Sequence, residues 1–205
     1  LATLKRRIEH VKRINRFITP IAVPLAEGLK VADLMDLKAS VPFDADGSGK
    51  GGNWSWITQD AAWLVYDPEG NGQVTSGLQL FGSVTFWLFW NDGYEALATL
   101  DDNADGQLSG AELQHLALWR DANGNGISEP GELTSLGKAG IMSLSCQRRS
   151  HASPHCKAFS PKGMTLGDGT IRPTYDLILY SKMQTVPVPP VTGTGSGKNR
   201  LALDR

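Results

Sequence analysis

Two twelve-residue segments of this chain place oxygen-bearing side chains and glycine at the same positions, and this repeat constrains the fold more than any other feature. The segments span residues 101–112 and 121–132. Each has Asp at position 1, Asn at 3, Asp or Asn at 5, Gly at 6 and Glu at 12. Glycine at position 6 allows a sharp turn, so side chains 1, 3, 5 and 12 and the carbonyl of position 7 can converge on one point.

This spacing predicts two calcium sites, because Ca²⁺ binds several hard oxygen ligands and a glutamate at position 12 can supply two of them. The predicted ligands of the first segment are Asp101, Asn103, Asp105, Gln107, Ser109 and Glu112. Those of the second segment are Asp121, Asn123, Asn125, Ile127, Glu129 and Glu132, with Glu129 acting directly or through water. The alternative is a pair of polar surface turns. It is the weaker explanation, because two segments in tandem match the full calcium-loop pattern.

The residues between the two segments suggest how the loops are joined. Residues 113–120 (121 − 101 − 12 = 8 residues) read LQHLALWR and are mostly apolar. We expect one short buried helix that ends the first loop and begins the second. A shared helix would hinder the opening and closing of a calcium sensor, so the arrangement favours a structural calcium site.

The net charge of −1 conceals a segregation of charge along the chain. Residues 1–32 carry 7 basic and 2 acidic side chains, residues 33–132 carry 3 and 16, and residues 133–205 carry 10 and 3. Part of the central acidity is ligand charge, and the rest can attract the basic ends or a basic partner. Nucleic acid is not an expected partner, because its binders more often carry a basic stripe on the main domain. The chain has no apolar run long enough for a transmembrane helix.

Three parts are expected along the chain. Residues 1–42 form a basic amphipathic helix over 1–19 and an extended arm with a short helix near 27–37. We expect this helix to dock on protein rather than on anionic lipid. Residues 43–182 form the calcium-binding domain, and the Pro/Gly-rich tail 183–205 is held by a partner subunit. The chain begins at Leu1 rather than Met, so we expect a processed form or a fragment.

Two upstream segments begin like the calcium loops but lack the closing glutamate. Residues 44–55 end on Ser and are expected to form a Gly-rich turn, whereas residues 67–78 end on Leu, followed by Gln79, and should keep their turn without tight calcium binding. The aromatic run 85–90, TFWLFW, is expected in the core rather than as a sugar platform. Further elements are expected as strands at 62–66, 141–146, 162–166 and 171–180, with Pro173 at a sheet edge, and as helices near 94–98 and 133–140.

The two cysteines leave three alternatives open. A disulfide between Cys146 and Cys156 is favoured, and it would stabilise the fold by roughly 3 kcal/mol. Zinc bound by these cysteines with His151 and His155 fits no standard spacing, and two free thiols are the third alternative. The chain shows no nucleophile elbow, zinc-protease helix or protease Cys/His pattern, so no catalytic residue is expected.

A family resemblance rests on the loop region. The run DGYEALATLDDNADGQLSGAEL, followed by LALWRDANGNGISEPGELTSLGKAGI, resembles the EF-hand-type calcium modules of bacterial exported and cell-surface proteins. YDPEGNGQVTSGLQLFG is similar to an earlier repeat of that kind, and the resemblance covers residues 44–145. It implies Ca²⁺ as the bound ion and an extracytoplasmic location, in the periplasm or at the cell surface. The expected fold class is α+β: a compact EF-hand-like loop–helix–loop calcium core with short helices, a small antiparallel sheet and extended termini.

The predicted function follows from these expectations. The chain is expected to be a non-catalytic, calcium-binding structural or accessory protein. Calcium would stabilise a module that contacts other protein subunits, including those of a membrane-associated complex. The alternatives are a calcium sensor and a non-catalytic calcium module of a larger secreted enzyme or adhesin.

Overall fold

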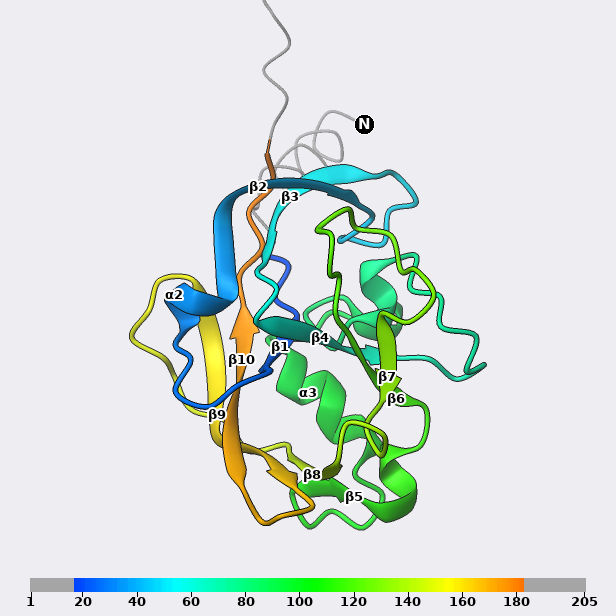
Figure 1. Cartoon of the computed structure of the whole chain (residues 1–205), viewed down its shortest axis with the longest axis vertical. Coiled ribbons are helices and arrows are strands. Elements are labelled where there is room, and N and C mark those ends of the chain that lie inside the picture. The colour runs from blue at the N-terminus through cyan, green and yellow to red at the C-terminus, as the bar shows by residue number, and fades with distance from the viewer. Residues whose placement is uncertain (1–16, 183–205) are drawn as a thin grey trace, which may run out of the picture.

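The structure, a computed structural model, describes residues 17–182, and its frame is an eight-stranded antiparallel sheet (Figure 1). The predicted N-terminal helix falls almost entirely outside the described residues, as does the tail 183–205. The strands in chain order are β1 (Ile21–Pro24), β2 (Met35–Phe43), β3 (Gly52–Ile57), β4 (Ala61–Tyr66), β5 (Gln107–Ser109), β6 (Leu116–Trp119), β7 (Leu133–Ser135), β8 (Ile141–Ser145), β9 (Cys156–Leu166) and β10 (Ile171–Leu177). The α-helices are α2 (Val31–Leu34) and α3 (Gly93–Leu97), and the 3₁₀ turns are η1 (Gly77–Gln79), η2 (Thr85–Trp87), η3 (Ala98–Leu100) and η4 (Gly110–Leu113).

The strand order in the large sheet is β5-β8-β9-β10-β1-β4-β6-β7, and β2 pairs with β3 as a separate hairpin. Every pairing between these strands is antiparallel. The prediction of an α+β fold with an EF-hand-like loop–helix–loop core is therefore wrong, because the described residues fold mainly as β-structure with very short helices.

The segment between the two acidic loops shows why that prediction failed. Residues Leu116–Trp119 form β6 and not a helix, and they pair with β4 through registers such as Leu64↔Leu118 and Trp63↔Trp119. A four-residue apolar run fits a buried strand as well as a helix, and only a distant partner strand decides between them. His115, with a φ of 68°, also interrupts any helix that would start at residue 113.

Both faces of the central strands are buried, against different parts of the chain. Along β4, Ala61, Trp63 and Val65 join one core, whereas Ala62 and Leu64 join the other. This follows from the period of two in a strand, which sends successive side chains to opposite faces. The first core includes the β2–β3 hairpin, and the second includes α3. The hairpin and α3 therefore cover opposite faces of the sheet.

Several local predictions can be compared with the elements directly. The strands predicted at 62–66, 141–146 and 162–166 are confirmed as β4, β8 and the end of β9. Asp92 caps α3, since its Oδ1 accepts from the N–H groups of Tyr94 and Glu95. The short helix predicted near 27–37 is present but is limited to α2, whereas the helix predicted at 133–140 is wrong, because this segment begins as β7.

Pro173 and the aromatic run 85–90 were also placed wrongly from sequence. β10 lies between β9 and β1, so Pro173 is not on an edge strand; it sits at a register shift between Arg172 and Thr174, where a bulge tolerates the missing N–H donor. In the run 85–90, Thr85 is buried and Phe86 and Trp90 are partly buried, but the side chains of Trp87, Leu88 and Phe89 are exposed. Those side chains turn outward because the backbone reverses direction at two residues with positive φ.

Candidate functional site

The first acidic loop, residues 101–112, closes on its own backbone. Oδ2 of Asp101 accepts a 2.8 Å hydrogen bond from the N–H of Gly106, whose φ of 85° makes the turn that glycine permits. Glu112 returns to the start of the loop, where Oε1 accepts from the N–H of Asp102 at 3.0 Å, and its Oε2 accepts from the N–H of Ser109 at 2.9 Å. The carboxylates of positions 1 and 12 therefore bracket the loop from its two ends.

The second acidic loop, residues 121–132, repeats these contacts position by position. Oδ2 of Asp121 accepts from the N–H of Gly126 at 2.8 Å, with Gly126 at a φ of 73°. Glu132 accepts from the N–H of Ala122 at 2.8 Å and from that of Glu129 at 3.1 Å. Because the carboxylates at positions 1 and 12 reach the same backbone positions in both loops, the repeat seen in the sequence is also a repeat in geometry.

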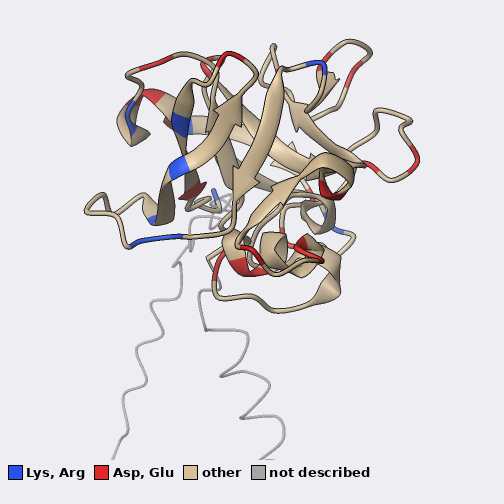
Figure 2. Ribbon diagram, turned by 90° about the horizontal axis from the view of Figure 1, so that it is seen from below, with Lys and Arg blue, Asp and Glu red and all other residues tan. Residues whose placement is uncertain are grey.

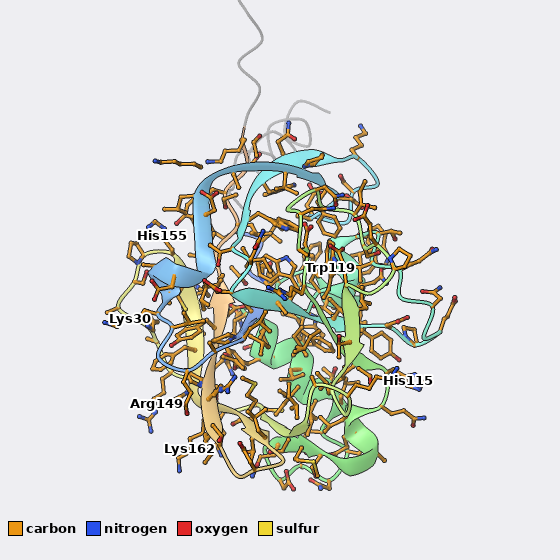
Figure 3. The ribbon with its side chains drawn as sticks, viewed as in Figure 1. Lys30, His115, Trp119, Arg149, His155 and Lys162 are labelled. Carbon is orange, nitrogen blue, oxygen red and sulfur yellow. The ribbon has the colours of Figure 1, made fainter. Side chains whose placement is uncertain are left out.

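Two buried indoles hold the second loop against the core. Nε1 of Trp56, on β3, donates to Oδ2 of Asp121 at 2.7 Å, and Nε1 of Trp119, on β6, donates to Oε2 of Glu132 at 3.3 Å. Trp56 and Trp119 pack edge to face with ring centroids 5.8 Å apart. Figure 3 shows Trp119 inside the fold, whereas His115 lies at its periphery. The first loop has no such indole partner among the hydrogen bonds of the described residues.

The two upstream loops share part of this arrangement. Asp44 accepts from the N–H of Gly49, and Asp67 accepts from the N–H of Gly72, so both use the same contact from position 1 to position 6. Oε1 of Gln79 accepts from the N–H of Thr75 at 2.9 Å, and Thr75 stands at position 9 of its loop. Gln79 therefore accepts from the N–H of position 9 through an amide oxygen, as Glu112 and Glu132 do through carboxylate oxygens. Figure 2 shows Asp and Glu mostly in loops at the periphery of the fold.

The carboxylates of the first loop act on the neighbouring thiol of Cys146. The pKa of this thiol is raised to about 12, first by burial and then by the charges of Asp101, Glu112 and Asp105. Three carboxylates of one loop thus act on one neighbouring group, as expected when they lie on the same side of the loop. The N–H of Cys146 also donates to the carbonyl of Gly106, which places β8 directly against the loop.

The cysteine predictions need correction. Cys146 and Cys156 are both free and buried, so the favoured disulfide is wrong. They lie in different hydrophobic cores, Cys146 in the one containing α3 and Cys156 in the one containing the hairpin. The rings of His151 and His155 instead pack edge to face on Phe159, Tyr175 and Tyr180.

A buried acid that the sequence analysis did not single out lies behind α3. Asp176, on β10, is fully buried, and Oδ1 accepts from the N–H of Gly93 at 3.1 Å. Burial raises the pKa of Asp176 well above its usual value, and the charge of Asp92 adds to this effect. Oδ2 of Asp176 and Oγ1 of Thr19 are buried without a hydrogen-bond partner among the described residues. The sequence signal for this group was an Asp directly before the apolar run 177–179.

The fold and the loops together define a β-rich domain in which four acidic loops turn on glycine. The chain belongs to the SPM domain family, whose model matches residues 26–179. It is also similar to the iron-regulated protein FrpA of Neisseria meningitidis serogroup C, with 39% identity over 111 residues. The aligned region covers 52% of this chain and 10% of FrpA, so the chain spans about a tenth of the length of this relative.

These findings correct the family assignment. The resemblance to EF-hand-type calcium modules is wrong as a statement of family, because an SPM domain matches and the fold is mostly β-sheet. Residues 17–182 also contain no group of three or more His, Cys, Asp or Glu side chains placed to hold a metal ion, so the predicted EF-hand metal-binding group is not shown. Within the same residues, no helix is long and apolar enough to cross a membrane.

Proposed function

We propose that this SPM domain is a non-catalytic module of a larger protein, in which Ca²⁺ closes the loops 101–112 and 121–132 and stabilises a surface for other protein subunits. The observation that carries the proposal is the shared loop geometry: Glu112 and Glu132 each return to the N–H groups of positions 2 and 9 of their own loop. Ca²⁺ needs oxygens from both ends of such a loop, and this return supplies them.

The loops can accept a cation without unfolding their turns. A carboxylate has about four lone-pair positions, and Asp101 uses two of its own on the N–H groups of Asp105 and Gly106. The remaining positions stay available for a metal ion. Neutral oxygens would complete the site, because Ca²⁺ also takes amide and backbone carbonyl ligands. This is why a site of this kind does not depend on three clustered acidic side chains.

The setting of the proposed module is extracytoplasmic. Each loop offers about three carboxylates, which gives no exceptional calcium affinity and suits a compartment where calcium is plentiful. The match to a tenth of FrpA supports the idea that such a domain is one part of a longer protein. For the partner surface, Lys30, Arg149 and Lys162 are exposed and lie along one edge in Figure 3, where they would attract an acidic protein surface.

Calorimetric titration with Ca²⁺ tests the proposal. We expect two sites in the unaltered chain, one in Glu112→Gln, one in Glu132→Gln and none in the double variant. The matched control is Glu27→Gln, an exposed glutamate outside all four loops that should retain both sites. At calcium concentrations about 100-fold above Kd, each occupied site should add about 2.7 kcal/mol of stability, so the unaltered chain should gain about twice as much as either single variant. Equal calcium binding by the unaltered chain and the double variant would show that the loops are not the sites.

The same titration separates a structural calcium site from a sensor. Asp121 and Glu132 are fixed to core indoles, so we expect calcium to perturb the fluorescence of Trp56 and Trp119 without exposing apolar surface. A hydrophobic dye should therefore bind no more strongly with calcium than without it. A large increase in dye binding would favour the sensor instead.

A further inference from the structure

The aromatic loop, residues 85–90, presents large apolar side chains on the surface of the domain. Trp87 is 70% exposed and Leu88 is 53% exposed. Phe17, where the described chain begins, is also 53% exposed. Single exposed apolar residues are common in soluble proteins, but several in one place mark a contact surface.

The backbone of the aromatic loop is held in a costly conformation that points Trp87 outward. Phe86 and Trp87 have φ values of 59° and 62°, a region that costs a bulky residue roughly 1–2 kcal/mol. Phe86 turns inward, packing edge to face on Tyr66 and Phe81. The side chain of Trp90 holds the two ends of the loop together, because its Nε1 donates to the carbonyl of Thr85 at 2.9 Å. The exposed aromatic side chains are therefore presented by a rigid support.

A pocket of about 400 Å³ opens beside this loop, between Phe17, Val84, Phe89 and Trp90. Thr19 also lines it, almost fully buried, with an Oγ1 that has no hydrogen-bond partner among residues 17–182. Ser83 joins the loop to the incoming chain, because its hydroxyl donates to the carbonyl of Phe17 at 2.9 Å. The pocket is thus concave and mainly apolar, and the N-terminal part of the chain forms one of its walls.

We propose that residues 1–16 of this chain cover the aromatic loop and this pocket with their apolar side chains. Leu4, Ile8, Val11 and Ile14 recur at intervals of three and four residues, and the segment ends directly at Phe17. No linker separates the segment from the pocket, so its effective concentration there is high. The segment's six basic side chains belong mainly to its other side and would remain available to an acidic partner.

The concave shape of the pocket favours this occupant over a lipid surface. A bilayer contacts a protein over a broad, flat surface, whereas a pocket lined by Phe17, Phe89 and Trp90 accepts individual apolar side chains. A second copy of the chain would have to pay the entropy of association that the attached segment avoids. Covering the loop with the attached segment would also offset the strain at Phe86 and Trp87.

Residue-resolved hydroxyl-radical labelling of the full chain tests this proposal. We expect slow labelling of Trp87 and Leu88 in the unaltered chain, and several-fold faster labelling when Ile8→Asn and Val11→Asn are combined. The matched control combines Arg6→Asn and Arg13→Asn on the opposite side of the segment and should leave the rate unchanged. Met142, 60% exposed, and Met164, 2% exposed, report in every sample that the domain remains folded.

The reciprocal variant guards against an effect on folding alone. Combining Trp87→Ser and Leu88→Ser should speed the labelling of Ile8 and Val11 several-fold. Equal labelling of Trp87 in the unaltered chain and in the Ile8/Val11 variant would overturn the proposal. Protection that appears only at high protein concentration would overturn it in favour of a second copy. Protection that appears only with phosphatidylglycerol vesicles would overturn it in favour of a membrane surface.

Discussion

The indole N–H of Trp56 donates a 2.7 Å hydrogen bond to Oδ2 of Asp121, and both side chains are buried. This contact joins position 1 of the second acidic loop to the centre of an aromatic cluster in which Trp56 also packs on Phe43, Trp63 and Trp119. A buried carboxylate is costly unless its oxygens are hydrogen-bonded. The loop conformation and the packing of the core therefore depend on each other.

Trp56→Phe should destabilise the domain more than Trp63→Phe. Both indoles are fully buried in the same cluster, but Nε1 of Trp63 has no hydrogen-bond partner among the described residues. The two changes remove similar volumes, and only the first deprives Asp121 of a donor. We expect an extra loss of about 1–3 kcal/mol in the free energy of unfolding for Trp56→Phe, measured by urea titration. Equal losses would mean that this hydrogen bond contributes nothing to stability.

Asp176→Asn should weaken the dependence of stability on pH. Because the folded pKa is raised, Asp176 contributes stability below the unfolded pKa of about 3.9, and that contribution is lost as pH rises toward the folded pKa. The variant cannot ionise, so residue 176 no longer binds different numbers of protons in the folded and unfolded states. We expect a flatter curve of unfolding free energy between about pH 4 and pH 8, and higher stability than the unaltered chain at the upper end.

The matched control for Asp176 is Asp168→Asn. Asp168 is fully exposed, and its pKa is lowered, first by the hydrogen bond from the N–H of Thr170. Removing its charge should leave the decline of stability with rising pH in place. A curve for Asp176→Asn that runs parallel to that of the unaltered chain would show that Asp176 does not titrate differently on folding.

The loops illustrate what could be predicted from the sequence. The contacts from position 1 to position 6 and from position 12 to position 9 are local, so residue type and spacing anticipate them. The flanking elements could not be inferred from the loops, because ligand spacing is set by metal chemistry and can occur on different folds. β6 became a strand through its pairing with β4, some fifty residues earlier in the chain, which periodicity cannot reveal.

The buried thiol of Cys156 gives a third prediction. Its pKa is raised to about 12, first by burial and then by the charge of Asp176. Because its folded pKa is raised, the Cys156 thiol contributes to the stability of the fold. That contribution is present below the unfolded pKa of about 8.5 and is lost as pH rises toward 12. Iodoacetamide should alkylate native Cys156 slowly even at about pH 9, where an exposed thiol is largely ionised. Denatured, unreduced protein should take up two alkyl groups. Uptake of none would show that Cys146 and Cys156 form a disulfide after all.

The side chains of the aromatic run show a second limit of sequence analysis. Five consecutive apolar residues after Thr85 indicate burial on average, but the positive φ at Phe86 and Trp87 sends neighbouring side chains in different directions. Non-glycine residues rarely adopt this conformation, so composition gives no sign of it. Asp176 was overlooked for a related reason: its partner Gly93 is distant in sequence, and its burial depends on α3 covering that face of the sheet.

Gly77→Ala should be among the most damaging small substitutions in the domain. A Cβ at Gly77 would overlap the backbone carbonyl of Ala45, and the N–H of Gly77 donates to the carbonyl of Asp44 at 2.8 Å. Backbone on both sides leaves no flexible side chain to move aside, so the two upstream loops would have to separate. We expect a loss on the order of 3–5 kcal/mol in the free energy of unfolding, measured by urea titration.

Gly51→Ala is the control, because a Cβ there meets no atom within 4 Å, and stability should change by less than about 1 kcal/mol. Similar losses for the two variants would show that the contact between the upstream loops is not required for the fold.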